Sequence, residues 1–150
     1  MRKTHYRDYA TAAFALLAKE GSSAAYKARI YNEAVERERE RTETRGSGIS
    51  APTEAAVMRA EQALYDAAAA LKDLEAAEWA LITLEKMRGR HAAMAVRAVY
   101  MLTPERELKR GEVTERVTAL SINMPADPSC IYRWLALARD LFAEKRGLRM

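Results

Sequence analysis

The side chains of this chain best suited to binding a charged partner are its arginines. The 150 residues include 18 arginines and 7 lysines, and the formal net charge is +4 at pH 7. A guanidinium group presents N–H donors in a planar fork, which matches phosphate oxygens and guanine edges better than an ammonium group does. A GC-rich genome also raises arginine and alanine together without selection for binding. The charge balance is therefore compatible with a polyanionic partner but does not establish one.

Residues that commonly perform catalysis or bind metals are not grouped in this sequence. His5 and His91 have no set of nearby ligands such as zinc requires. Ser129 lacks an accompanying His and Asp pattern, and Cys130 has no basic orienting partner. Neither a phosphate-binding loop nor a dinucleotide fingerprint occurs. We therefore expect no enzymatic activity, no cofactor and no metal.

The composition indicates an all-α protein. Hydrophobic residues make up 49% of the chain, and 30 of them are alanine, the strongest helix former. Only 6 valines and 5 isoleucines are present, which nearly excludes a large sheet. The sequence contains no run of about 18 apolar residues, the length that would span a membrane. The first residues lack the apolar stretch of a signal peptide, and the single cysteine, Cys130, cannot form an internal disulfide, so we expect a cytoplasmic protein.

Helical periodicity predicts an alanine-rich scaffold over residues 1–90. A first helix is expected over 4–20, and a second follows Gly21. The second helix enters residues 36–45, where Glu and Arg alternate, so neighbours three and four positions apart have mixed signs. This pattern indicates a solvated helix end rather than a binding tract. Residues 45–52 contain two Gly, two Ser and a Pro and predict a linker.

A long central helix is predicted over 53–88, a segment without glycine or proline. Ser50 or Thr53 can cap its start, and Gly89 ends it. Apolar residues recur along it with seven-residue spacing in two registers, at Val57, Leu64 and Leu71 and at Ala60, Ala67, Leu74 and Leu81. This face could brace the first two helices or form the seam of a homodimer. The sequence does not rank these two uses.

Residues 91–150 predict a second, helical module. A helix fits 91–102 and ends before Pro104, because the residue that precedes proline avoids the helical conformation. Its inward positions are predicted to be Met94 or Ala95, with Ala98, Val99 and Leu102. The charged segment that follows, RELKRGEVTERVTAL, favours a helix, and SINMPADPS, residues 121–129, favours a loop. The last helix begins with Asp127 as cap and Pro128 in its first turn, and it ends at Gly147.

The segment SCIYRWLALARDLFAEKRGL, residues 129–148, resembles the recognition helix of sigma-factor region 4 and of phage-encoded regulators with a region-4-like module. The residues that carry the resemblance are Ser129, Ile131, Tyr132-Arg133, Ala138-Arg139 and Leu141-Phe142. Residues 111–120 resemble the supporting helix, and 92–102 the helix beneath it. The link before the last helix is predicted to be about eight residues, whereas the family turn has about four.

The resemblance implies a helix-turn-helix that binds double-stranded DNA. The start of the recognition helix, with its free N–H groups and positive dipole end, would attract a phosphate. The residues expected to contact DNA are Ser129, Tyr132, Arg133, Arg139, Lys145 and Arg146 from the last helix, with Arg110 and Arg116 from the supporting helix.

We therefore predict a helical bundle with a long central helix and a C-terminal helix-turn-helix, acting as a transcriptional regulator of phage or prophage origin. Duplex DNA is the predicted partner, and RNA polymerase is a further candidate. A second copy of this chain, bound as a homodimer through the 53–88 helix, is the third candidate partner. The alternative is a helical protein-interaction module that binds RNA polymerase or a phage packaging complex and never contacts DNA. An amphipathic last helix with a merely solvated outer face fits this alternative.

Overall fold

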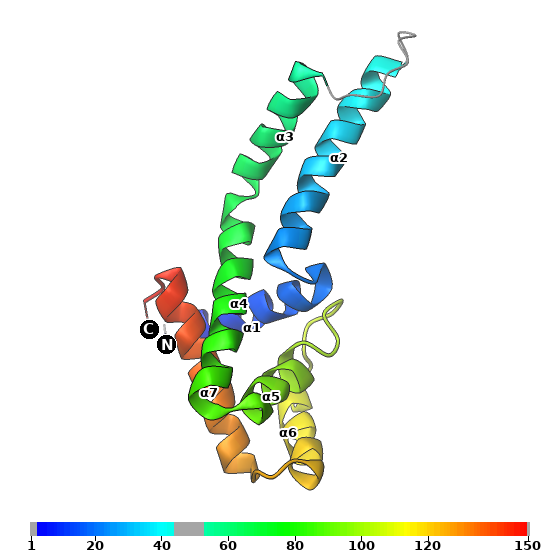
Figure 1. Ribbon diagram of the computed structural model, residues 1–150. Helices are drawn as coiled ribbons and strands as arrows, with labels where there is room; N and C mark the ends of the chain where they lie inside the picture. The colour runs from blue at the N-terminus through cyan, green and yellow to red at the C-terminus, as the bar shows by residue number, and fades with distance from the viewer. Residues whose placement is uncertain (1–2, 44–52, 150) are drawn as a thin grey trace.

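The computed structural model describes residues 3–43 and 53–149, and within these ranges it consists of seven helices without a strand (Figure 1). The helices are α1 (Lys3–Glu20), α2 (Ser23–Glu43), α3 (Glu54–Asp66), α4 (Ala68–Arg88), α5 (Arg90–Tyr100), α6 (Glu112–Asn123) and α7 (Pro128–Arg146). The predicted all-α class is confirmed. No helix among these is long and apolar enough to cross a bilayer. The predicted linker at 45–52, the alternative cap Ser50 and the side chain of His5 lie outside what is described.

Helices α2 and α3 form a two-helix arm that projects from a body built of α1 and α4–α7 (Figure 1). Ala34 on α2 and Ala56 and Ala60 on α3 are buried, so small side chains let the two helices approach closely. The predicted solvated end of α2 is wrong at Glu38. Its side chain is buried, and its Oε2 lies 2.8 Å from Nε of Arg59 on α3. An ion pair therefore joins the two helices at a segment where the sequence indicated pairs of opposite charge within one solvated helix end.

The predicted continuous helix over 53–88 is interrupted at Ala67. This residue has φ −92° and ψ 6°, ends α3 and precedes α4. The ends agree with the prediction, because Thr53 Oγ1 accepts a hydrogen bond from the Ala56 N–H at 3.1 Å and Gly89 follows the last turn with φ 94°. The interruption has a packing reason: α3 lies against α2, whereas α4 packs mainly against α1, α5 and α7. Helices α3 and α4 therefore take the directions set by the different helices that they pack against.

The apolar face of this region is used inside the chain. Ala60 is buried in the arm, and Leu74, Leu81 and Leu84 of α4 are buried in the body. The body core also holds Phe14 of α1 and residues of α5 and α7, so helices on both sides of residue 90 share it. Ala60, Leu74 and Leu81, one register of the face predicted as either a brace or a dimer seam, therefore brace other helices of the same chain. Val57, Leu64 and Leu71 of the other register are only partly buried.

Helix α5 presents Ala92, Ala95, Val96 and Val99 to the core, and each is fully buried. Of the predicted inward residues, Ala95 and Val99 are thus confirmed. Met94 is 49% exposed and Leu102 is 63% exposed. Met94 lies on the opposite side of α5 from the buried stripe, and Leu102 follows the end of the helix. The helix predicted from periodicity ended at residue 102, whereas α5 ends at Tyr100.

The loops around α6 differ from the prediction in length. Residues 101–111 form a loop, Gly111 with φ 84° precedes the helix, and α6 then continues through Asn123. The predicted loop at 121–129 shrinks to the four residues 124–127. The segment before Pro125 contains no helix breaker, and Met124, which precedes the proline, is extended with φ −118° and ψ 143°. The expected eight-residue link is therefore wrong.

The start of α7 has the predicted cap. The carboxylate of Asp127 accepts a hydrogen bond from the Cys130 N–H at 2.8 Å, and Pro128 is the first helical residue. Asp127→Ala is expected to lower the free energy of unfolding by about 1 kcal/mol, because it removes this acceptor. Urea unfolding measures the change, with Asp127→Asn as the control that keeps an acceptor. Equal losses in both variants would contradict the capping role.

Candidate nucleic-acid interface

Helix α7 is anchored along one face and open along another at its beginning. Ile131 and Leu135 are buried in the same core as Val117 of α6, and Leu120 and Trp134 pack at its edge. This packing fixes α6 and α7 relative to each other across the turn at 124–127. The side chains of the first two turns of α7 that face away from this core remain available for a partner.

Three of the predicted DNA-contacting residues lie on that open face. Ser129, Tyr132 and Arg133 are exposed, and the Tyr132 hydroxyl donates a hydrogen bond to Thr114 Oγ1 of α6 at 3.2 Å. Within residues 3–43 and 53–149, the Arg133 guanidinium makes neither a hydrogen bond nor an ion pair. Its charge is therefore free for an external anion. Asp127 already uses the Cys130 N–H, so the side chains rather than the helix end offer the contacts.

Three other predicted residues are used inside the protein. Arg139 donates from Nη1 to the Tyr100 hydroxyl at 2.7 Å, and Arg146 Nε lies 2.6 Å from Asp73 Oδ1. Arg116 donates to the Val99 carbonyl at 2.7 Å. The sequence predicts one covered stripe along α7, but α1, α4, α5 and α6 all pack against this helix. The outer face of α7 is correspondingly shorter than predicted.

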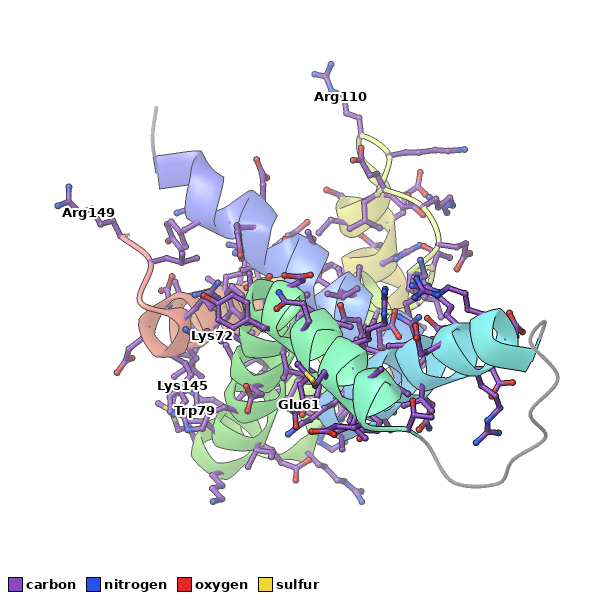
Figure 2. The ribbon with its side chains drawn as sticks, turned by 90° about the horizontal axis from the view of Figure 1, so that it is seen from above. Glu61, Lys72, Trp79, Arg110, Lys145 and Arg149 are labelled. Carbon is purple, nitrogen blue, oxygen red and sulfur yellow. The ribbon has the colours of Figure 1, made fainter. Side chains whose placement is uncertain are left out.

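The last two predicted residues, Arg110 and Lys145, are exposed but lie on different parts of the molecule. Arg110 extends from the 101–111 loop away from the helices (Figure 2). Lys145 Nζ lies 5.3 Å from the centre of the Trp79 ring on α4, a cation–π contact (Figure 2). Arg110 is available for a phosphate, whereas Lys145 belongs to the contact between α4 and the end of α7.

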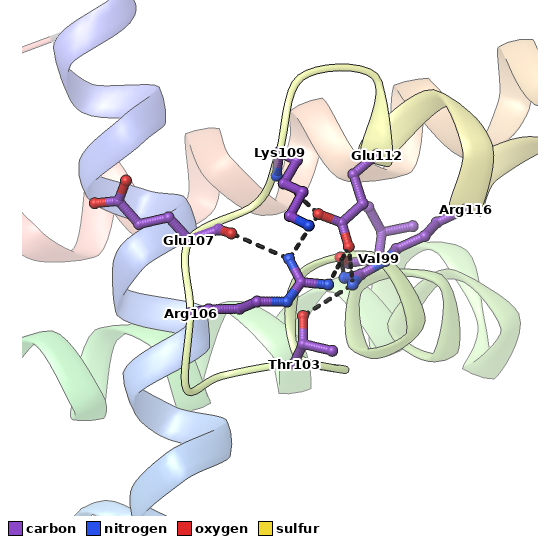
Figure 3. Close-up of polar contacts among 7 residues, drawn as sticks. All are labelled: Val99, Thr103, Arg106, Glu107, Lys109, Glu112 and Arg116. Atoms are coloured by element: carbon purple, nitrogen blue, oxygen red, sulfur yellow. Dashed lines mark hydrogen bonds and ion pairs between the residues drawn. The ribbon is translucent and has the colours of Figure 1, made fainter.

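A polar network that the sequence analysis missed holds the 101–111 loop against α6 (Figure 3). Glu112 Oε2 accepts hydrogen bonds at 2.6 Å from both Arg106 and Arg116, and Glu112 Oε1 accepts one at 2.7 Å from the Lys109 N–H. Arg116 also donates to Thr103 Oγ1 at 2.8 Å. The detectable signal was Glu112 in the first turn of a helix, four residues before an arginine.

The network should make stability depend on pH through Glu112. The Arg106 hydrogen bond and then the Lys109 N–H lower the pKa of Glu112 from 4.5 to about 2. The ionised carboxylate therefore stabilises the fold above pH 4.5, and this contribution is lost as the pH falls towards 2. Thermal unfolding of the wild type and Glu112→Gln should differ most near neutral pH and converge in acid. A Tm difference that does not shrink in acid would contradict this assignment.

The described side chains do not form a metal site. Among the side chains described, no three His, Cys, Asp or Glu residues come together as metal ligands. The candidate interface thus consists of Ser129, Tyr132 and Arg133 on α7, with Arg110 on the loop before α6. No protein-family model, characterised relative or solved structure matches this chain. Its function must be inferred from its own residues and their placement.

Proposed function

We propose that the chain binds double-stranded DNA with a helix-turn-helix composed of α6, the turn at 124–127 and α7, and acts as a transcriptional regulator. The observation that carries the proposal is the four-residue turn followed by the free guanidinium of Arg133 on the open face of α7. In helix-turn-helix proteins the first residues of the second helix contact base edges, and the first helix crosses the backbone. The four-residue turn also agrees with the turn of about four residues in the region-4 family, whereas the predicted link of about eight residues disagreed with it.

Each residue of the interface has a distinct part in this proposal. Arg133 lies one turn into α7, where it can reach a guanine edge or a phosphate in the major groove. Ser129 lies beside it and donates to the DNA backbone, Tyr132 can turn its hydroxyl from Thr114 to a phosphate oxygen, and Arg110 contributes a phosphate contact from the neighbouring loop. A regulator of this kind fits a phage or prophage source, with RNA polymerase as an additional partner.

Fluorescence anisotropy with a labelled duplex of mixed sequence tests the proposal. Arg133→Ala should weaken binding about tenfold, the effect of losing one good base or phosphate contact. The matched control is Arg37→Ala, which removes the same charge from an exposed position on the α2–α3 arm. Equal affinities of Arg133→Ala and Arg37→Ala for the duplex would contradict the role of α7.

One observation favours a second function, docking of a protein on the arm. Met58 is 64% exposed and Tyr65 is 78% exposed, and their spacing of two turns places both on one face of α3. Large exposed apolar side chains that share a face are typical of a protein contact. Purified RNA polymerase should bind the wild type and not Tyr65→Glu if the arm docks on it. Binding of the polymerase to Tyr65→Glu with unchanged affinity would exclude this surface.

A further inference from the structure

We propose that the cavity between α1 and the 101–111 loop binds a small organic anion that has an apolar body. The cavity has a volume of about 960 Å³, within the size range of small-molecule sites. Side chains of α1 line one side, the loop lines the other, and Tyr100, Val113 and Arg139 complete the lining. Ser129, Tyr132 and Arg133 do not line this cavity, and Arg110 is the one residue that it shares with the proposed DNA interface.

The charges around the cavity favour an anion. The lining contains six basic residues, Arg7, Lys19, Arg106, Lys109, Arg110 and Arg139, and three acidic ones, Asp8, Glu105 and Glu107. Glu112 is outside the lining and neutralises Arg106. The remaining excess of positive charge is concentrated in a concave site, which raises the local concentration of anions.

Arg139 is the residue that most clearly lacks a counter-charge. Its side chain is half-buried, and its Nη1 donates to the Tyr100 hydroxyl at 2.7 Å. Its Nε is enclosed and has no hydrogen-bond partner. No carboxylate lies within 4.0 Å of this guanidinium among the side chains described. Burial raises the pKa of Tyr100, so the phenol stays neutral near pH 7 and does not balance the charge.

A partly buried guanidinium that faces only a neutral partner is costly, because desolvation of the charge is not compensated by an opposite one. An anion in the cavity would supply that compensation. A carboxylate, sulfonate or phosphate group suits the Nη2 side of Arg139, because Nη1 already donates to Tyr100 and hydrogen bonds between ionised groups are the strong ones. The acidic group of the ligand is therefore placed at the Arg139 end of the cavity.

The apolar part of the ligand is assigned from the remaining walls. Leu16 and Ala15 of α1 face the cavity from one side, and Leu108 and Val113 line it from the other. The Glu112 network fixes the loop that carries Leu108, so the site is formed before a ligand binds. Binding to a preformed site is favoured, because little free energy is lost in ordering the protein. The assigned ligand is an anion with an aromatic or aliphatic body.

The fluorescent probe 8-anilinonaphthalene-1-sulfonate tests this assignment, because it joins a sulfonate to an apolar ring system. We expect saturable binding at one site, at least about tenfold tighter than that of uncharged N-phenyl-1-naphthylamine, a difference of about 1.4 kcal/mol. Ala12→Glu places a carboxylate in the cavity wall from an exposed position on α1 and should weaken probe binding about tenfold. Ala28→Glu on α2, also exposed, is the matched control and should bind as the wild type does.

Arg139→Gln should also weaken binding of the sulfonate probe, while leaving binding of the uncharged probe unchanged. The proposal is overturned if the two probes bind equally, or if Ala12→Glu and Ala28→Glu bind the sulfonate with the same affinity. Absence of saturable binding to the wild type would overturn it as well. The measurement contains no DNA, so a failure of the DNA proposal leaves this result unaffected.

Discussion

Replacing Phe142 by alanine is expected to lower the free energy of unfolding by about 3–5 kcal/mol, the usual cost of truncating a buried aromatic residue. Phe142 is fully buried on α7. Its ring centre lies 6.1 Å from that of Phe14 and 5.9 Å from that of Tyr9, both on α1. Phe14 in turn stacks on Tyr100 of α5 at 6.3 Å. The truncation would therefore open a cavity where three helices meet.

Denaturant unfolding followed by circular dichroism measures this loss. Phe142→Leu should cost clearly less than Phe142→Ala, because leucine fills more of the space. Tyr65→Ala on the exposed face of α3 provides the control for removing an aromatic side chain without making a cavity. If Phe142→Ala changes the unfolding free energy as little as Tyr65→Ala, the arrangement of α1, α5 and α7 described above is wrong.

Replacing Arg116 by methionine is expected to lower the free energy of unfolding by about 2–3 kcal/mol. The Arg116 side chain is 11% exposed and donates to three groups: the Val99 carbonyl, Thr103 and the Glu112 carboxylate. Methionine keeps most of the apolar stem but leaves the carbonyl and the half-buried carboxylate without this donor. Hydrogen bonds to charged groups contribute about 1.5–3 kcal/mol, which sets the expected size.

Hydrogen exchange localises the effect of Arg116→Met. Amides of the 101–111 loop should exchange faster, because this loop is held to α6 through Arg116 and Glu112. Arg97→Met, on an exposed part of α5, is the matched control. Equal protection of the loop in the two variants would show that the network does not fix it.

The sequence predicted the ends of helices best where a local residue decides them. Thr53 and Asp127 accept the expected cap hydrogen bonds, and Gly21, Gly89 and Gly147 follow the ends of helices with positive φ. Each of these signals acts within a few residues, through a side-chain acceptor or through the freedom of glycine at positive φ. No tertiary contact is needed to recognise them.

The errors arise where distant packing decides. The interruption at Ala67 follows from the different partners of α3 and α4, which no seven-residue pattern reveals. Two prolines near residue 125 suggested a long loop, but α6 can continue until the residue before the first proline is reached.

Packing against distant helices also explains why only part of the candidate interface could be predicted from the sequence. Arg133 is exposed as expected, because it lies opposite the stripe that contains Ile131 and Leu135. Arg139 was also expected on the outer side, yet Tyr100 of α5 is its partner. Arg146 lies four residues after Phe142 on the covered side, where Asp73 of α4 is its partner. Periodicity identifies the first covered face of a helix and gives no information about a second one.

The most direct test of the central claim is the affinity for duplex DNA as a function of salt, from about 50 to 200 mM. If α7 and the 101–111 loop contact phosphates, the logarithm of the association constant falls linearly with the logarithm of salt concentration, by about 0.9 per phosphate contacted. Arg133→Ala should reduce this slope by about one unit, and Arg37→Ala should leave it unchanged. No binding by the wild type at the lowest salt concentration would contradict the proposed function.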